Sequence, residues 1–529
     1  MDSIFIKIPL FFIKKIYDKA DKLYTIVRLK AIFLLPISSG GHAAYQDFLK
    51  TNLPIYYPNP DSIPSSTWNI IERFWHLDLS YTDELLRSKY SVFGPKPRTP
   101  SCMQRSYLLS LTFKVTSITD WAAQLKLNPL YAILSGFAFG DTPGVGTFYD
   151  FFDRLWDSPK DNLSPPIHPL KTKKPKKPKT KGAKADSIEK VTVAELLPLL
   201  EHTSFPLEEQ PYASLFQIYK KEFLDVSVSK NFIHSDSLAL AGDGTPVVTS
   251  HRERKKRICD CKEKGITNYL CDRYFSQPDC DIGWDSSRNC WYHGYDLYML
   301  VDSQSDLPVF PLFSCASRHD SHGFLHTFFR MKSFLPNFKI TKVLLDSAHD
   351  AMPYYQYFNR ENITPFIDLN DKGGRPPVYK NDFTIDKDGV PICPAGCRMH
   401  RDGIEVAKGR MKFKCPKMCR KNGGISCSCE TPCSDAKYGR TVHLVLKDNP
   451  RLFNNPPRNS KEWKLEYNAR TSVERSNKRE KIDFPLESGR HRSTKMWYCR
   501  LYHILMLQHL DAWDLPNESA LRKLIQPTA

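Results

Sequence analysis

Strand-like and helix-like stretches alternate in a definite order between residues 237 and 369, and this order constrains the fold more than any other feature of the sequence. Apolar runs of strand length and amphipathic runs of helix length predict three strands, a helix, a strand, a helix and a final strand. The predicted elements cover residues 237–248, 291–301, 307–316, 322–334, 340–345, 351–359 and 363–369. An α/β domain is therefore expected.

This order is that of an RNase H-like fold that lacks only its last helix. The long charged stretch 460–481 supplies that helix, and a further helix is predicted at about 494–513. Residues 371–438 are rich in Gly, Pro, Lys and Cys and do not fit the order, so we interpret them as an insertion. The core then consists of two parts, residues 235–370 and residues 439–515 with the C-terminal helices.

The region before this core divides into three segments. Residues 1–64 have no pattern to which we assign a function. Residues 65–160 predict several short helices, which suit a helix-turn-helix-like DNA-binding domain. They suit a plain helical bundle equally well, and the pattern alone favours the bundle. Residues 161–190 are rich in Lys and Pro, and we interpret them as a disordered linker that could also grip a DNA backbone.

The charge balance favours a polyanionic partner. The 529 residues include 76 Lys and Arg against 58 Asp and Glu, a formal net charge of +18. Lys and Arg that neutralise phosphates release condensed counterions, so such an excess is typical of proteins that bind nucleic acid. The sequence predicts no membrane-spanning segment and no secretory signal. We therefore expect a cytoplasmic protein whose cysteines stay reduced.

Three carboxylates occupy positions that suit a metal site. Asp243 lies at the end of an apolar strand and is flanked by Gly242 and Gly244, which would let a bulky ligand approach the backbone. Asp346 follows the buried strand at 340–345, and Glu474 lies in the middle of the late helix. Carboxylates that meet at one sheet edge repel one another unless divalent cations join them. Two Mg²⁺ or Mn²⁺ ions held there could carry out phosphoryl transfer.

The late helix carries a second signal around Glu474. Tyr467, Arg470 and Lys481 lie at spacings that place them within about 60° of Glu474 on one helix face. They would offer hydrogen-bond donors and positive charge to DNA phosphates. The alternative is a solvated helix with ordinary charge pairs between residues four apart.

Four residues match the Y-(2)-R-(3)-E-(6)-K signature of DDE transposases from bacterial insertion sequences: Tyr467, Arg470, Glu474 and Lys481. The segments Gly-Asp-Gly-Thr around Asp243 and Leu-Leu-Asp-Ser-Ala-His-Asp around Asp346 resemble the first and second aspartate motifs of that family. The segments at Asn128–Pro129 and 147–151 resemble its helical N-terminal domain.

The resemblance covers roughly residues 70–158 and 235–513. It implies DNA transposition, in which the enzyme hydrolyses DNA at the 3′ ends of the element and then joins those ends to target DNA. Asp243, Asp346 and Glu474 would be the catalytic, metal-binding residues. The implied partners are the terminal inverted repeats, target DNA and a second copy of the chain in the synaptic complex, and the implied setting is a prokaryotic cytoplasm.

Several alternatives remain open. Asp350 could replace Asp346 as the second ligand, and Asp320 and Asp368 also lie near strand ends. The chain could be a transposase-derived DNA-binding protein without activity, or an RNase H-like nuclease. It contains no phosphate-binding Gly-rich loop, no His-Glu-x-x-His motif and no nucleophile elbow.

Most cysteines fall into two clusters. The first lies between the first two core strands and comprises Cys259, Cys261, Cys271, Cys280 and Cys290. The second lies in the insertion and comprises Cys393, Cys397, Cys415, Cys419, Cys427, Cys429 and Cys433. Paired cysteines in a small apolar-poor segment predict a structural zinc site, above all in the second cluster. The alternative is a set of free, partly buried thiols.

Overall fold

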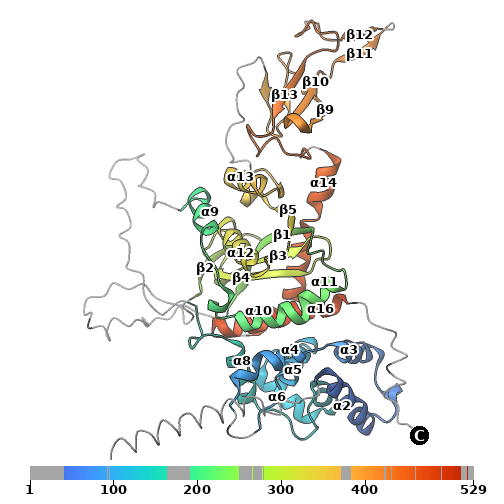
Figure 1. Cartoon of the computed structure of the whole chain (residues 1–529), viewed down its shortest axis with the longest axis vertical. Coiled ribbons are helices and arrows are strands. Elements are labelled where there is room, and N and C mark those ends of the chain that lie inside the picture. Colours follow the sequence, from blue (N-terminus) through green and yellow to red (C-terminus); the bar gives the residue numbers. More distant parts are fainter. Residues whose placement is uncertain are drawn as a thin grey trace, which may run out of the picture. The chain divides into compact units, whose positions relative to one another are not determined.

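The structure is a computed structural model, and it describes most of the chain (Figure 1). The described ranges are 41–163, 191–249, 279–370 and 383–513, without positions 92, 94, 95, 422, 423, 431, 459 and 490, and with Gly265, Gln277 and Leu521 in addition. The Lys/Pro-rich segment and Cys259, Cys261 and Cys271 lie outside the described residues. None of the described helices is both long and apolar enough to cross a membrane.

The chain forms two compact units, each built from segments that are far apart in the sequence. The helical unit comprises Met1–Leu163, Glu208–Lys230 and Glu480–Ala529, and the sheet unit comprises Ser164–Leu207 and Asn231–Arg479. We expected residues 439–515 to form one part of the core. The contacts instead divide them, because the long helix α16 (Thr494–Ala512) packs among the helices of the helical unit.

The described part of the helical unit contains helices only. Its longer helices are α2 (Gly41–Tyr56), α3 (Ser65–His76), α4 (Ser80–Leu86), α5 (Pro100–Thr112), α6 (Ile118–Leu127), α7 (Pro129–Ser135), α8 (Val145–Leu155), α10 (Ala213–Tyr219) and α16. Local signals set their ends: the Ser117 hydroxyl caps α6, and the Asn128 side chain caps α7. The helical pattern predicted for residues 65–160 is thus confirmed. Helix α16 is buried on nearly all sides and forms the centre of this core.

The sheet unit contains one mixed sheet. Its strands are β1 (Leu238–Val248), β2 (Asp281–Asp285), β3 (Cys290–Asp302), β4 (Pro308–Cys315), β5 (Ile340–Leu345) and β6 (Thr364–Ile367). Their order is β2-β3-β1-β5-β6, with β4 paired to β3. The pairs β1–β3 and β3–β4 are antiparallel, whereas β1–β5 and β5–β6 are parallel. The predicted strands are all present, and β2 is an additional one.

Helices pack on this sheet where the sequence predicts them. Helix α12 (Asp320–Phe334) contacts β1, β3 and β4, and α13 (Met352–Arg360) contacts β6. The backbones of β1 and β3 lie very close together at Gly294. A Cβ on this residue would stand 1.9 Å from the Val247 carbonyl oxygen. Only glycine fits there. The described part of the sheet unit is therefore a mixed α/β structure.

The single late helix predicted at 460–481 is broken in the structure. Helix α14 (Lys461–Asn468) ends before Ala469, α15 (Thr471–Lys478) follows, and the π-helical turn η7 covers Arg479–Asp483. The two halves pack on different strands: α14 contacts β6 and α15 contacts β1 and β3. The two halves are separated by a turn at Ala469 and Arg470, whose backbone N–H groups donate to the carbonyls of Glu466 and Tyr467.

The insertion forms small antiparallel sheets with a core of their own. Strands β9 (His400–Glu405), β10 (Arg410–Lys414) and β13 (Thr441–Val445) form one sheet in the order β13-β10-β9. Two short hairpins accompany it, made by β7 (Thr384–Ile385) with β8 (Pro391–Ile392) and by β11 (Met418–Lys421) with β12 (Gly424–Cys427). The predicted end of the insertion at residue 438 is too early, because β13 is the edge partner of β10.

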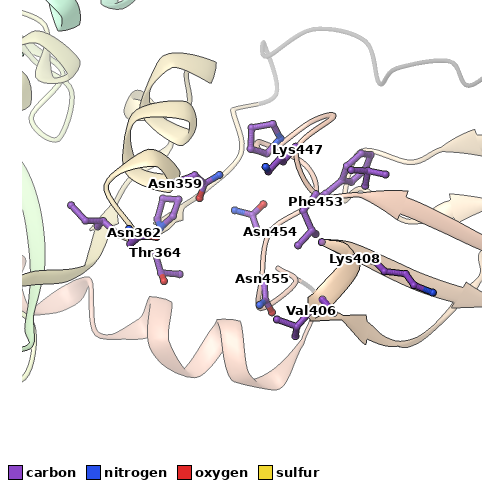
Figure 2. A pocket seen from close by; sticks show the side chains of 16 residues that line it. Asn359, Asn362, Thr364, Val406, Lys408, Lys447, Phe453, Asn454 and Asn455 are labelled. Carbon is purple, nitrogen blue, oxygen red and sulfur yellow. The ribbon is translucent and has the colours of Figure 1, made fainter.

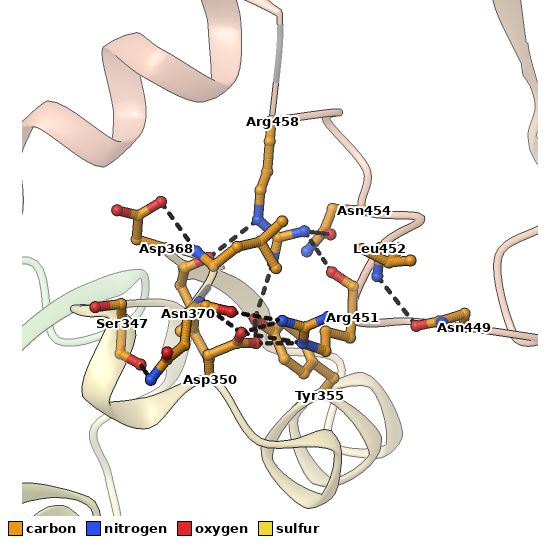
Figure 3. A network of polar contacts seen from close by, with 12 residues as sticks. Ser347, Asp350, Tyr355, Asp368, Asn370, Asn449, Arg451, Leu452, Asn454 and Arg458 are labelled. Atoms are coloured by element: carbon orange, nitrogen blue, oxygen red, sulfur yellow. Dashed lines mark hydrogen bonds and ion pairs between the residues drawn. The ribbon is translucent and has the colours of Figure 1, made fainter. Parts of the chain in front are cut away.

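A buried ion pair ties the segment that returns from the insertion to the core (Figure 3). The Arg451 guanidinium donates to both oxygens of Asp350, at 2.8 Å from Nε to Oδ1. The Asp350 side chain is fully buried and also accepts from Asn370 N and the Tyr355 hydroxyl. Arg458 extends the network by donating to the Tyr355 hydroxyl and to the Ile367 carbonyl.

Removing one partner of this pair leaves an uncompensated buried charge. We expect Asp350→Ala to lower the free energy of unfolding by about 3–5 kcal/mol in urea denaturation. The matched control is Glu466→Ala, because Glu466 pairs with Lys342 at 2.7 Å but both side chains are more than one-third exposed. That variant should lose at most about 1 kcal/mol. Equal losses in the two variants would contradict the structural role of Asp350.

Candidate functional site

Asp243 and Asp346 lie level with each other, Asp243 in strand β1 and Asp346 directly after the neighbouring parallel strand β5. Asp243 is in the middle of β1, not at its end as expected, because β1 continues to Val248. Leu344 of β5 pairs with Ala241 of β1, so Asp346, two residues further on, comes level with Asp243. The parallel pairing of β1 and β5 thus brings two carboxylates of distant segments together.

The two carboxyl groups have pKa values shifted in opposite directions. Burial raises the pKa of Asp243 to about 7, and the charges of Asp346 and Asp320 add to this shift. Burial also acts to raise the pKa of Asp346, but hydrogen bonds from His349 and Ala348 N outweigh it, and this pKa lies below its usual value. Asp346 therefore stays ionised, while Asp243 holds a proton more readily in the absence of a cation.

Glu474 is linked to this site by an ion pair with Arg470. Its helix, α15, packs on β1 and β3, and its carboxylate is about half exposed. Arg470 donates to Glu474 in an ion pair. Burial acts to lower the pKa of Arg470, but the charges of Tyr467, Glu474 and Asp243 outweigh it. Arg470 is therefore the cation that stands among the carboxylates.

The other two signature residues lie apart. Tyr467 of α14 stacks on Trp463, with ring centroids 4.6 Å apart, and burial raises its pKa to about 12. Lys481 belongs to η7 and to the helical unit. The break at Ala469 and Arg470 separates Tyr467 from Glu474. Lys481 follows Glu474 through α15 and η7, whose π-helical turn departs from the α-helical spacing on which the shared helix face was predicted.

The glycines beside Asp243 make room for the protein's own side chains rather than for a ligand. A Cβ on Gly242 would stand 3.0 Å from the Tyr298 hydroxyl, and one on Gly244 would stand 2.6 Å from Asp320 Oδ1. Side chains alternate along a strand, so both glycines face away from the side of the sheet to which Asp243 points. The space above them is already filled.

Two further carboxylates gather near Gly244. Asp320, at the start of α12, was only an alternative in the sequence, and Asp296 of β3 was not predicted at all. Burial, together with Asp320 and Asp243, raises the pKa of Asp296 far above its usual value. Within the described residues Asp296 Oδ2 has no hydrogen-bond partner. An Asp inside an otherwise apolar strand was the signal for this residue in the sequence.

The structure distinguishes Asp346 from two of its three alternatives, Asp350 and Asp368. Asp350 is already bound by Arg451, Tyr355 and Asn370 N (Figure 3). Asp368, after β6, is exposed and accepts a hydrogen bond from the neighbouring Leu369 N. Their contacts are those of a structural carboxylate and a surface carboxylate, whereas Asp346 faces Asp243.

A cleft of about 730 Å³ opens elsewhere in the sheet unit (Figure 2). It lies between the α13–β6 segment and the insertion. Four asparagines and two lysines stand out among its lining residues: Asn359, Asn362, Asn454, Asn455, Lys408 and Lys447. No acidic residue lines it. The cleft suits a polar or anionic ligand, but it lacks the carboxylates that a catalytic metal would need.

The described cysteines of the insertion are free thiols that lie near one another. They are Cys393, Cys397, Cys415, Cys427, Cys429 and Cys433. Cys393 and Cys415 are buried at the edge of the insertion core, whereas the side chain of Cys419 lies outside the described residues. The sulfurs of Cys427 and Cys415 interact, as do those of Cys433 and Cys393. Soft thiol ligands at this density fit zinc chemically.

No ready-made metal cage is present in the described ranges, since no three His, Cys, Asp or Glu side chains there are grouped as metal ligands. In the first cysteine cluster, Cys280 is buried against Gln277, whereas Cys290 is exposed at the other end of the β2–β3 hairpin. In comparisons with known proteins, no protein-family model matches the chain and no curated protein matches it.

Zinc in the insertion can be measured directly. We expect elemental analysis of protein produced with zinc present to show about one or two zinc ions per chain, held by thiolates. The double variant Cys393→Ser/Cys415→Ser should lose at least one of them. Cys290→Ser, which changes an exposed thiol of the other cluster, should keep the full content. Zinc-free wild-type protein would contradict the zinc hypothesis for both clusters.

Proposed function

We propose that this protein is a DDE-type DNA transposase with an RNase H-like catalytic core. The observation that supports this most is the placement of Asp243 in β1 level with Asp346 directly after the adjacent parallel strand β5, with opposed pKa shifts and with Arg470 beside them. The strand order β4-β3-β1-β5-β6, three strands antiparallel and two parallel, is also the arrangement such a core needs. The match to the transposase signature at Tyr467, Arg470 and Glu474 agrees with it.

Asp243, Asp346 and Glu474 are the residues that would hold two Mg²⁺ or Mn²⁺ ions. Their chemistry fits, because carboxylate oxygens are the preferred ligands of these ions and the crowded acids need positive charge. When bound, such ions activate the attacking water or hydroxyl and stabilise the leaving oxygen. Glu474 would have to release Arg470 to take part.

The basic residues of the site have a role of their own. Once Glu474 turns away, the Arg470 guanidinium can bind a DNA phosphate with two parallel hydrogen bonds. Tyr467 can position the same backbone through its hydroxyl. The net charge of +18 would draw DNA towards the protein, and the helical unit and the Lys/Pro-rich linker would contact the element ends.

Two alternatives belong to other classes. A transposase-derived DNA-binding protein without activity would keep the helical unit and the charge but would not need Asp243 and Asp346 to lie together. An RNase H-like nuclease would share the carboxylates but would not join DNA ends. Strand joining by a homodimer on paired DNA ends is therefore the property that distinguishes the proposal.

The test is cleavage and strand transfer on DNA duplexes that carry the sequences flanking the coding region, in Mg²⁺ or Mn²⁺. Asp243→Ala, Asp346→Ala and Glu474→Ala should each lose more than about a hundredfold in cleavage rate, since even an indirect partner of a metal ligand costs 10- to 100-fold. Binding to the same duplexes should persist, because the basic residues are unchanged.

Asp368→Ala is the matched control, because this acid follows the neighbouring strand β6 but is exposed. It should cleave like the wild type. Wild-type cleavage in any of the three carboxylate variants would show that the residue in question is wrongly assigned. Cleavage without strand transfer would favour the nuclease, and DNA binding without either would favour the inactive binding protein.

A further inference from the structure

A fully buried histidine lies directly behind Asp346. His349 ends the short 3₁₀ helix η5 (Ser347–His349), three residues after Asp346. Both of its ring nitrogens have a partner: Nδ1 is 2.6 Å from Asp346 Oδ1, and Nε2 is 2.9 Å from the Tyr298 hydroxyl. The side chain of His349 has no exposed surface, and Tyr298 is buried as well.

The protons of this chain of contacts follow from the charge of Asp346. An ionised carboxylate can only accept hydrogen bonds, so His349 Nδ1 donates to Asp346. A ring that carries its proton on Nδ1 accepts at Nε2, and the Tyr298 hydroxyl then donates to it. Each of the three groups thus fixes the orientation of the next.

Packing holds the histidine ring in this orientation. The rings of Tyr298, Phe324 and Tyr354 surround it, with centroids 5.8, 5.7 and 6.2 Å from its own. The Tyr298 hydroxyl in turn occupies the space that Gly242 leaves free. A ring enclosed on these sides cannot turn away from Asp346 without disturbing the sheet.

The hydrogen bonds to Asp346 fall on one oxygen. His349 Nδ1 and Ala348 N both donate to Oδ1, at 2.6 and 3.1 Å. Within the described residues Oδ2 is left without a hydrogen bond, and the side chain is about one-third exposed. The network therefore occupies Oδ1 of Asp346 with internal hydrogen bonds and leaves Oδ2 available to a ligand.

We propose that His349 is a positioning residue that orients Asp346 for a divalent cation, with Tyr298 fixing the tautomer of its ring. This inference rests on the proposed function, because it assumes that Asp346 binds the cation. Partners behind metal ligands commonly contribute 10- to 100-fold to metal affinity or activity, since they fix the ligand before the metal arrives.

The first measurement is Mn²⁺ binding to the full-length, DNA-free protein by titration calorimetry. His349→Phe keeps the ring but removes the donor, and we expect Mn²⁺ to bind about 10- to 100-fold more weakly. His349→Asn should bind within a few-fold of wild type, because its amide NH₂ can take the place of Nδ1. His349→Gln should bind more weakly than His349→Asn, because its longer side chain carries the amide to the position of Nε2.

The tyrosines supply a matched pair. Tyr298→Phe removes the hydroxyl that holds Nε2 and should weaken Mn²⁺ binding by several-fold. Tyr354→Phe removes a buried hydroxyl from the same aromatic group, but that hydroxyl donates to the Ser321 carbonyl and not to His349. Its Mn²⁺ affinity should equal that of the wild type, so a general loss of core stability cannot explain the difference.

The second measurement is the Mg²⁺ concentration that gives half-maximal DNA cleavage. It should rise in His349→Phe, whereas DNA affinity should not change. Equal Mn²⁺ affinity in wild type and His349→Phe overturns the inference if Asp346→Ala abolishes binding. If His349→Phe does not fold, equal affinity in His349→Asn and His349→Gln overturns it instead. Undiminished Mn²⁺ binding by Asp346→Ala would overturn both the inference and the proposed role of Asp346.

Discussion

The repulsion between carboxylates that are buried against one sheet is the interaction on which the rest of the site depends. Asp243, Asp346 and Asp320 each raise the pKa of at least one other carboxyl group of this cluster, and the pKa of Asp296 is raised by Asp320 and Asp243. Burying so much negative charge is costly unless it is protonated, paired or bound to a cation. The groups around these acids reduce that cost, because His349 holds Asp346 ionised and Arg470 supplies positive charge.

Under the proposed function, the ion pair between Arg470 and Glu474 has a role before a cation binds. Without an ion, the arginine neutralises part of the acid cluster and keeps Glu474 occupied. A divalent cation can replace that positive charge, which frees the guanidinium for another anion. A DNA phosphate is the anion that the charge of this chain favours. Under the proposed function, the ion pair is a resting arrangement that the binding of metal and DNA would exchange.

The sequence predicted the parts of the fold that depend on local pattern. Apolar periodicity and end signals predicted the helices α12 and α13 and, of the strands β1 to β6, all except β2. It did not predict the break after Asn468, because the residues from Asn468 to Thr471 include no Gly or Pro that would signal one. Asp296 and His349 were missed because their roles arise from strand register and not from spacing along the chain.

The insertion and the candidate site are connected through one short segment. This segment is residues 346–350. Asp346 and His349 belong to the candidate site, and Asp350, which follows His349, binds Arg451 of the chain that returns from the insertion. The side chains of His349 and Asp350 are fully buried, and the 3₁₀ turn that precedes Asp350 leaves little freedom to move one without the other. A displacement of the insertion would therefore be felt at the carboxylate that we assign to the metal. This coupling gives a physical reason for a stable insertion core and for an ion pair rather than a weaker contact at Asp350.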